Sequence, residues 1–416
     1  MSRLIFHIDA NSAYLSWEAT YRLQQGEQID LREIPSVVGG DEESRHGIVL
    51  TKSIPAKKFN IKTGETLHNA RIKCPEIIIV PPRYWLYMQC SSAMNQIFLE
   101  YTPNIQRFSV DESFLDLSNM GHLYPDYIEL ADGLRERIKK ELGFTVNIGI
   151  SNNKLLAKVA SDFKKPDRVH TLFPHEIKEK MWPLAVEDLF MVGRATAPKL
   201  HNLNINTIGD LATYDLEILK NKLKSHGQVI WNYANGIESS EVRKSNYIDM
   251  KGIGNSTTIA FDVEDKETAH KVLLSLCETV GMRIRDSKNC CSVVSISIRG
   301  SDLIFYSRQK KLSTATDSTR KIYEVACYLF DNVWKGNPIR HLGVHITDFC
   351  GNDFYQCSLL DTFDYEKDRK INDSVDKIRL KYGSKAVVRS CFLNSGISAM
   401  CGGVGEEDYP IMSAIL

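Results

Sequence analysis

Three carboxylates in this 416-residue chain stand where a charge is costly. Asp9 follows residues 4–8, an apolar run that predicts a buried strand. Asp111 and Glu112 interrupt a second apolar stretch, residues 108–117. A buried carboxylate is unfavourable unless it is paired or binds a cation. A cluster of such groups can hold two Mg²⁺ ions about 3.5–4 Å apart, as in enzymes that transfer phosphoryl groups.

The same spacing also fits a structural explanation. In that alternative, Asp111 and Glu112 form a hairpin turn and Asp9 caps a helix. Residues 39–42 (Gly-Gly-Asp-Glu) resemble a hairpin of the diguanylate cyclases, but charged and polar residues follow where that family has an aromatic. We interpret this second acidic motif as a solvated loop.

The composition is that of an ordinary globular protein. With 43% hydrophobic and 25% charged residues, disorder over the whole chain is excluded. The length predicts roughly two to four domains. No apolar run reaches the ~18–20 residues of a membrane span, and residues 1–9 lack a secretory signal pattern. The ten cysteines include no Cys-x-x-Cys pair, which argues against structural zinc and predicts reduced thiols in the cytoplasm.

The first part of the chain alternates strand and helix patterns around one insertion. Strands are expected at residues 4–8 and 144–150, and residues 108–117 predict either two paired strands or one long strand. Helices are expected at 11–23, 82–101, 127–142 and 153–163. This order fits a split βαβ, ferredoxin-like core. Residues 1–25 and 82–168 would form this core, and the β-rich residues 26–81 would be an insert.

The second part predicts a helical domain followed by a separate α/β domain. We expect helices over residues 169–240, a polar linker over 241–256, and alternating helices and strands over 257–349, with one strand at 302–307. Residues 350–416 predict a tail with one helix at 370–382. The expected fold class is therefore α+β with several domains.

Several motifs in sequence order resemble the Y-family translesion DNA polymerases, closest to the bacterial DNA polymerase IV branch. They are residues 8–14 (Ile-Asp-Ala-Asn-Ser-Ala-Tyr), 56–64, 109–116 (Ser-Val-Asp-Glu-Ser-Phe-Leu-Asp), 149–166 and 192–209. The resemblance covers roughly residues 1–350. It implies a ferredoxin-like palm at 1–25 and 82–168, fingers at 26–81, a helix-hairpin-helix thumb at 169–240 and a little finger at 257–349.

The resemblance also implies a two-metal active site. Asp9, Asp111 and Glu112 would be the catalytic carboxylates. Together with the backbone carbonyl of Ala10 they would bind two Mg²⁺ ions, with Mn²⁺ as an alternative.

Tyr14 falls on the family's steric gate, where an aromatic ring fills the space that a ribose 2′-OH would need. Packing in the first turn of a helix is the alternative explanation of this residue. The other nucleotide-binding residues would be Ser12, Ala13, Lys57 and Lys165. At two positions the chain departs from the family, because Ile54 and Lys57 stand where Tyr and Arg are usual. Lys57 keeps the charge but loses the bidentate fork of Arg.

The resemblance further implies contacts with DNA and with a replication protein. The DNA-binding residues would be Gly193 and Arg194 in the thumb and Arg308, Lys310 and Lys311 in the little finger. Residues 356–360 resemble a sliding-clamp motif, carried by Gln356, Ser358, Leu359 and Leu360, with Leu360 in place of an aromatic. The alternatives are solvated charges in the little finger and tail residues that pack on the core.

The implied function is template-directed DNA synthesis, in which a primer 3′-OH attacks a dNTP, with lesion bypass and low fidelity. The implied partners are primer–template DNA, dNTP and the sliding clamp, for a monomeric cytoplasmic protein without a membrane segment. Two alternatives stay open. One is a nucleotide cyclase on a palm-like core, and the other is a catalytically weak accessory protein that binds DNA or the clamp.

Basic and acidic residues are distributed unevenly along the chain. The chain has 52 Lys and Arg against 52 Asp and Glu, whereas a basic excess is usual for nucleic-acid binding. Residues 300–345 carry seven basic and four acidic residues, and residues 350–416 carry eight and ten. A local excess therefore lies in the expected DNA-binding domain, and the zero total does not exclude DNA as a partner.

Overall fold

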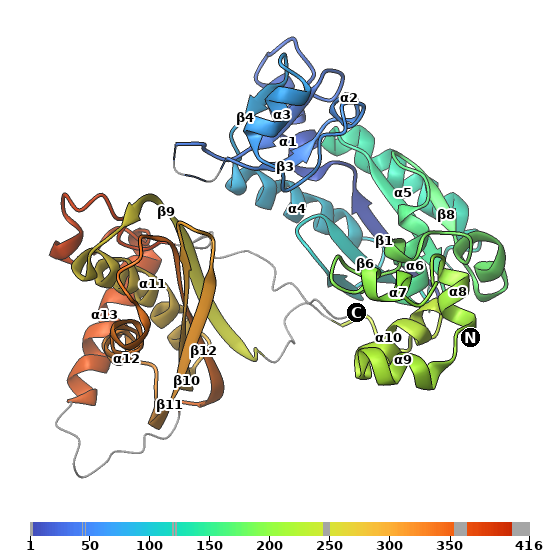
Figure 1. Cartoon of the computed structure of the whole chain (residues 1–416). Coiled ribbons are helices and arrows are strands. Elements are labelled where there is room, and N and C mark those ends of the chain that lie inside the picture. The colour runs from blue at the N-terminus through green and yellow to red at the C-terminus, as the bar shows by residue number, and fades with distance from the viewer. Residues whose placement is uncertain are drawn as a thin grey trace. The chain divides into compact units, whose positions relative to one another are not determined.

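The structure is a computed structural model that describes residues 3–43, 45, 47–118, 120, 123–243, 250–352 and 364–401. These residues fall into two compact units, whose elements are labelled in Figure 1. The first unit contains the described residues of 3–39 and 49–243, and the second contains those of 40–48 and 250–401. None of the described helices is long and apolar enough to cross a membrane.

The first unit is built on a five-stranded sheet with the order β5-β6-β1-β7-β8. Its strands are β1 (Ile5–Ala10), β5 (Ile105–Arg107), β6 (Glu112–Asp116), β7 (Val146–Ser151) and β8 (Val169–Thr171). The central strand β1 pairs antiparallel with both neighbours, and all six of its residues are buried. Burial on both faces explains why its sequence is a continuous apolar run rather than an alternating one.

Helices cover both faces of this sheet. On one face, α1 (Ala13–Gln24), α4 (Tyr84–Leu99) and α5 (Tyr127–Leu142) pack against Phe6 and Ile8. On the other, α6 (Lys154–Asp162) packs against Ile5. Helix α5 lies at the predicted position, between an Asp126 cap and Gly143, whose left-handed φ of 77° ends it.

The insert between α1 and α4 is a small sheet of its own. Strands β2 (Ser36–Gly39), β3 (Val49–Lys52) and β4 (Ile78–Val80) have the order β3-β2-β4. Two short helices follow β3 in the chain, α2 (Ile54–Lys57) and α3 (Leu67–Lys73). The core of this insert is separate from the core of the larger sheet.

The rest of the first unit is helical. It contains η1 (Pro174–Glu176), η2 (Ile177–Met181), η3 (Val186–Asp188), α7 (Ala197–His201), α8 (Ile208–Thr213), α9 (Leu216–Leu223) and α10 (Ser225–Ala234). Their apolar side chains share one core with Leu155 and Leu156 of α6. These helices are therefore packed onto the sheet that carries the carboxylates.

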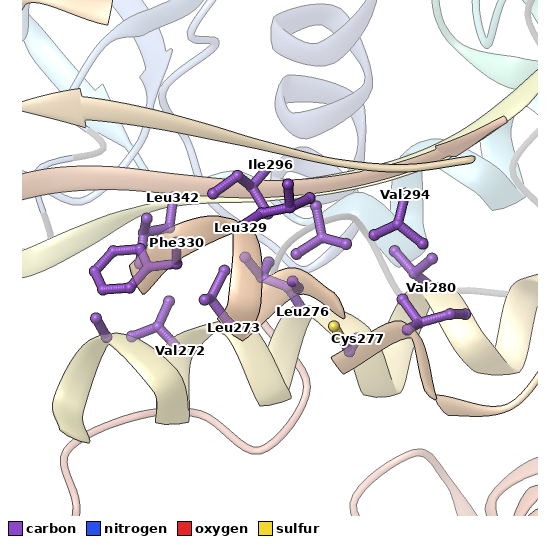
Figure 2. Close-up of a cluster of buried hydrophobic side chains, with 14 of the residues drawn as sticks. Val272, Leu273, Leu276, Cys277, Val280, Val294, Ile296, Leu329, Phe330 and Leu342 are labelled. Carbon is purple, nitrogen blue, oxygen red and sulfur yellow. The ribbon is translucent and has the colours of Figure 1, made fainter. Parts of the chain in front are cut away.

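The second unit is a four-stranded antiparallel sheet with helices on one face. The strands β9 (Gly252–Val263), β10 (Asn289–Gly300), β11 (Phe305–Thr316) and β12 (Ile339–Gly351) have the order β11-β10-β12-β9. Helices α11 (Lys266–Asp286) and α12 (Thr319–Val333) pack against it. Figure 2 shows Leu276 and Val280 of α11 beneath Val294 and Ile296 of β10.

Two predicted boundaries are wrong. The expected linker over residues 241–256 is too long, because β9 already begins at Gly252 and pairs with β12. The strand expected at 302–307 instead begins at Phe305, since residues 301–304 make the turn between β10 and β11.

The helix expected at 370–382 is present and begins earlier, but residues 364–401 pack on the second unit rather than forming a separate tail. Helix α13 (Tyr365–Tyr382) is docked on the second unit, where Arg379 of α13 forms a buried ion pair with Glu278 of α11 at 2.7 Å. After it, Phe392 in η4 (Ser390–Phe392) and Ile397 enter the core of this unit. The sequence of residues 364–401 is polar because the side chains that attach this segment to the second unit are charged. They pair with residues far away in the sequence.

Candidate active site

The fold brings the predicted carboxylates together at one end of two neighbouring strands. Asp9 in β1 lies directly opposite Glu112 in β6. The backbone N–H of Ala10 donates to the carbonyl of Asp111 at 3.0 Å. The Asp111 carboxylate in turn accepts a hydrogen bond from Ser109 Oγ at 2.5 Å. Asp9, Ala10, Asp111 and Glu112 are thus neighbours, although about a hundred residues separate the two pairs in sequence.

Two lysines of the α6 region lie against these carboxylates. Lys158 Nζ contacts Glu112 at 2.6 Å, and Lys165 forms an ion pair with Asp9. Lys165 also contacts Asp162 at 2.8 Å. Sequence reasoning assigned Lys165 to a triphosphate and did not include Lys158 in the site. No local spacing signals Lys158, because its partner Glu112 lies 46 residues away in the sequence.

Burial dominates the electrostatics of the carboxylates. It raises the pKa of Asp9 to about 7, with the charge of Lys165 opposing the shift and the charges of Glu112 and Asp111 adding to it. Burial also raises the pKa of Glu112, against the charge of Lys158. His7, buried beside them with Nδ1 2.8 Å from Ser161 Oγ, adds no positive charge, because burial lowers its pKa well below the usual value. The two lysines leave this negative cluster incompletely neutralised.

The donor set fits a hard divalent cation. The carboxylates of Asp9, Asp111 and Glu112 and the Ala10 carbonyl offer only oxygen, which Mg²⁺ prefers. Across the described part of the chain, no three His, Cys, Asp or Glu side chains already lie in an arrangement that could hold a metal ion. The lysine contacts explain this, because a metal would compete with Lys165 and Lys158 for the same oxygens.

Beside the carboxylates, the start of α1 presents an aromatic ring. Ser12 precedes the helix with a left-handed φ of 50°, and Ala13 is buried. The Tyr14 ring stacks on Tyr87 of α4 with ring centroids 4.4 Å apart, and Tyr84 meets it edge-on at 6.3 Å. Packing therefore holds the Tyr14 ring in one place, so the packing explanation and the gate explanation are compatible.

The small insert carries a group of lysines. Lys57, at the end of α2, is exposed, and Ile54 is 46% exposed. Lys52 at the end of β3 was missed by sequence reasoning. Burial lowers its pKa, and the positive charges of Lys57, Lys62 and Lys73 lower it further. Several like charges near one another make this insert a place for an anion.

The predicted DNA-binding residues are scattered over both units. Gly193 and Arg194 are exposed in the turn before α7, where the Gly193 carbonyl accepts from Thr196 N at 2.9 Å. Arg308, Lys310 and Lys311 are exposed on β11, an edge strand of the second unit.

The three cations of β11 do not share one face. Lys310 lies over the Tyr328 ring of α12 at 4.1 Å, on the helix side of the sheet. Its neighbour Lys311 points to the other face and pairs with Asp348 at 3.1 Å. Arg308 lies opposite Ile296, a core residue, and is therefore also on the helix side.

The helix-free face of this sheet was missed by sequence reasoning. Two open hollows on it are lined by Gly254, Asn255, Ser256, Ser295, Ser297, Ser307, Gln309, Gly343 and His345, among others. A Cβ added at Gly254 would come within 2.5 Å of the His345 ring, so the glycine lets that ring lie flat on the strand. The signal in the sequence was the alternation of small polar residues along the strands.

The candidate clamp motif cannot be placed. Gln356, Ser358, Leu359 and Leu360 lie outside the described residues.

Comparisons with known proteins agree with this architecture. Residues 8–162 match the impB/mucB/samB family, and residues 250–359 match the C-terminal domain of the same family. The DNA polymerase IV of Clostridium acetobutylicum is 49% identical, over 94% of this chain and 99% of that protein. DNA polymerase IV 2 of Bacillus subtilis is 35% identical, over 94% of this chain and 95% of its own.

A solved structure extends the agreement to the fold. A Y-family DNA polymerase chimera superposes with a TM-score of 0.71 and covers 84% of this chain and all of its own, at 22% identity. This match confirms the expected α+β multidomain fold class. The chain belongs to the impB/mucB/samB family of Y-family DNA polymerases, among relatives named DNA polymerase IV.

Proposed function

We propose that this chain catalyses template-directed DNA synthesis, transferring a nucleotide from a dNTP to a primer 3′-OH, with lesion bypass and low fidelity. Family membership supports the activity. The observation that carries the chemistry is the pairing of Asp9 with Glu112 beside Asp111 at the end of a central strand. A nucleotide cyclase has less support, because the relatives extend over the helical part and the second unit as well.

Asp9, Asp111, Glu112 and the Ala10 carbonyl would hold two Mg²⁺ ions, with Mn²⁺ as an alternative. When bound, such ions lower the pKa of an attacking hydroxyl and neutralise charge on a triphosphate. Lys165 contacts Asp9 without a nucleotide and is the cation that would transfer to the triphosphate once the carboxylates bind metal. Because Lys158 stays beside Glu112, it would orient that carboxylate.

The nucleotide would lie against α1 and the insert. The Tyr14 ring, braced by Tyr87, would exclude a ribose 2′-OH, and Ser12 and Ala13 would line the same turn. Lys57 would contact the triphosphate in place of the family's Arg. Lys52 lies close enough to Lys57 to supply a second charge, which offsets the missing fork.

Primer–template DNA would contact both units. Gly193 and Arg194 in the helical part, and Arg308, Lys310 and Lys311 on the edge strand, are exposed for phosphate contacts. Because β11 is an edge strand, the cations on both of its faces lie at the rim of the sheet. A phosphate backbone that runs along this rim would be within reach of all three. We also propose that Gln356–Leu360 bind the sliding clamp, and that the protein works as a monomer in the cytoplasm.

Primer extension tests the proposal. Wild-type protein with Mg²⁺ and all four dNTPs should extend a primer on undamaged and on abasic templates. The double variant Asp111→Ala, Glu112→Ala should lose the rate by roughly a thousandfold or more, because the cation site loses two of its three carboxylates. The matched control is Asp132→Ala, Glu136→Ala, which removes two exposed carboxylates of α5.

Three results would overturn the proposal. If the double variant extends primers as well as wild type does, the metal site lies elsewhere. If wild type binds primer–template DNA but never extends it with Mg²⁺ or Mn²⁺, the accessory-protein alternative is correct. Cyclisation of GTP in place of extension would favour the cyclase.

A further inference from the structure

Two cysteines lie directly opposite each other in the second unit. Cys290 at the start of β10 is in register with Cys350 at the end of β12. The pairing continues on both sides, since Asn289 faces Gly351 and the N–H of Asn352 donates to the carbonyl of Lys288 at 3.2 Å. Directly opposed residues of antiparallel strands share a face, with Cα atoms about 4.5–5.5 Å apart. A disulfide needs Cα atoms about 4.4–6.8 Å apart, so this pair can be bridged without moving the backbone.

The two thiols differ in access. Cys350 is exposed, whereas Cys290 is 2% exposed. Burial raises the pKa of the Cys290 thiol to about 12, and the nearby Asp317 and Cys350 add to the shift. Because Cys350 is the exposed thiol, an oxidant in solution meets it first, and Cys290, directly opposite in the register, is the thiol placed to resolve the adduct.

The adjacent Cys291 is not equivalent. It lies opposite Phe349 and not opposite a cysteine. Its side chain enters the hydrophobic core, where Sγ is 3.3 Å from the carbonyl of Thr316. The strand register therefore places Cys290, and not its neighbour Cys291, opposite Cys350. Cys291 can serve as a control for the pairing.

We propose that Cys290 and Cys350 are a redox-modification site that forms a reversible cross-strand disulfide. The oxidant is a low-molecular-weight disulfide such as glutathione disulfide. The Cys350 thiolate attacks it, forms a mixed disulfide and releases one thiolate. Cys290 then loses its proton and attacks the Cys350 sulfur, which expels the second thiolate. Two protein thiols are oxidised, the small disulfide is reduced by two electrons, and the protons go to the two small thiols.

The disulfide would hold the end of β12 against the start of β10. Asp348, two residues before Cys350, has a left-handed φ of 60°, so the last residues of β12 follow an irregularity in the strand. A covalent tie to β10 holds them in register.

The test maps thiols in the folded full-length protein. The protein is incubated with glutathione disulfide without denaturant, its remaining thiols are alkylated, and its peptides are identified by mass spectrometry. Wild type should lose two free thiols, gain one link between the peptides that contain Cys290 and Cys350, and recover both thiols with dithiothreitol. The link should disappear in Cys290→Ser and Cys350→Ser and persist in Cys291→Ser. Cys391→Ser, which removes another exposed cysteine, should also leave it unchanged.

Three results would overturn the proposal. One is the absence of the link in folded wild type, and another is a link that survives in Cys290→Ser. The third is a Cys350 link to any other cysteine that forms as fast. Thermal unfolding provides a second measurement, because the oxidised wild type should melt several degrees above the reduced protein, and Cys350→Ser should show no such shift.

Discussion

At the scale of residues, the candidate active site is a cluster of buried carboxylates whose charge two lysines neutralise only in part. Asp9 and Glu112 each contact a lysine, yet the pKa of Asp9 is still raised to about 7 because burial outweighs Lys165. A site that keeps its carboxylates buried and only partly neutralised is suited to a cation that arrives with its substrate. In the absence of a cation, Lys165 and Lys158 pair with these carboxylates.

Tyr14 provides a prediction at this scale. Replacing Tyr14 with Ala should remove the ring that excludes a 2′-OH and lower discrimination against ribonucleotides by on the order of 10- to 100-fold. Tyr14→Phe is the matched control, because it keeps the ring and its stacking on Tyr87. The measurement is kcat/KM for a dNTP and the corresponding rNTP. An unchanged ratio in Tyr14→Ala would show that another group is the gate.

At the scale of elements, a buried lysine joins α6 to the chain that leaves the helical part. Lys154 is fully buried, and its Nζ donates to Gln106 Oε1 at 3.2 Å and to the carbonyl of Glu241 at 2.9 Å. The Gln106 oxygen also accepts from the N–H of Arg243 at 3.1 Å. The Lys154 side chain and Gln106 therefore hold residues 241–243 against β5.

We expect Lys154→Met to lower the free energy of unfolding by roughly 1–3 kcal/mol, because it leaves buried acceptors on Gln106 and Glu241 without a donor. Lys164→Met, which replaces an exposed lysine nearby, should change it little. Denaturant unfolding under reducing conditions measures both. Equal stability of Lys154→Met and wild type would mean that the contacts with Gln106 and Glu241 contribute nothing net.

Lys154 also makes the free energy of unfolding depend on pH, and the sign of this dependence follows from its pKa. Burial lowers the pKa of Lys154 to about 8, whereas an unfolded lysine titrates near ~10.4. Between these values the unfolded chain binds more protons, so this group makes the free energy of unfolding rise with pH. The stability difference between wild type and Lys154→Met should therefore widen as the pH rises above 8, and a constant difference would contradict the shift.

A second element-scale prediction concerns the docking of α13. Glu278 of α11 is buried and accepts from Arg379 at 2.7 Å and from Arg389 at 2.5 Å. Glu278→Ala should destabilise the protein by about 3–5 kcal/mol, because it leaves the buried Arg379 charge unpaired. Glu267→Ala, at an exposed position of the same helix, is the control. Hydrogen exchange should show α13 opening first in Glu278→Ala, and unchanged protection there would refute its anchoring role.

At the scale of the whole molecule, zero net charge conceals a local excess in the second unit. Arg308 is exposed on β11, an edge strand of this unit, on the helix side of the sheet. A phosphate contact contributes about −0.9 to the slope of log binding constant against log salt concentration. Arg308→Ala should therefore make that slope about one less steep in primer–template titrations. Lys271→Ala, which removes a lysine of α11 that pairs with Glu267, should not change it, and an unchanged slope in Arg308→Ala would remove Arg308 from the interface.

The sequence by itself determined a good part of this protein. A buried strand before Asp9, a capped amphipathic helix at 127–142 and the order of elements follow from local patterns, because apolar periodicity and capping act over a few residues. The motifs that carry the family resemblance are local too, and the comparisons confirm the family and the fold class.

Tertiary structure decided what depends on pairs far apart in the chain. Lys165 contacts Asp9 across 156 residues, and Arg379 contacts Glu278 across about a hundred. Register placed Cys350 opposite Cys290 and put Lys310 and Lys311 on different faces of β11. No local pattern encodes these contacts, because a charge or a thiol looks alike in sequence whether it faces solvent or a partner. Only the packing of the elements settles which it meets.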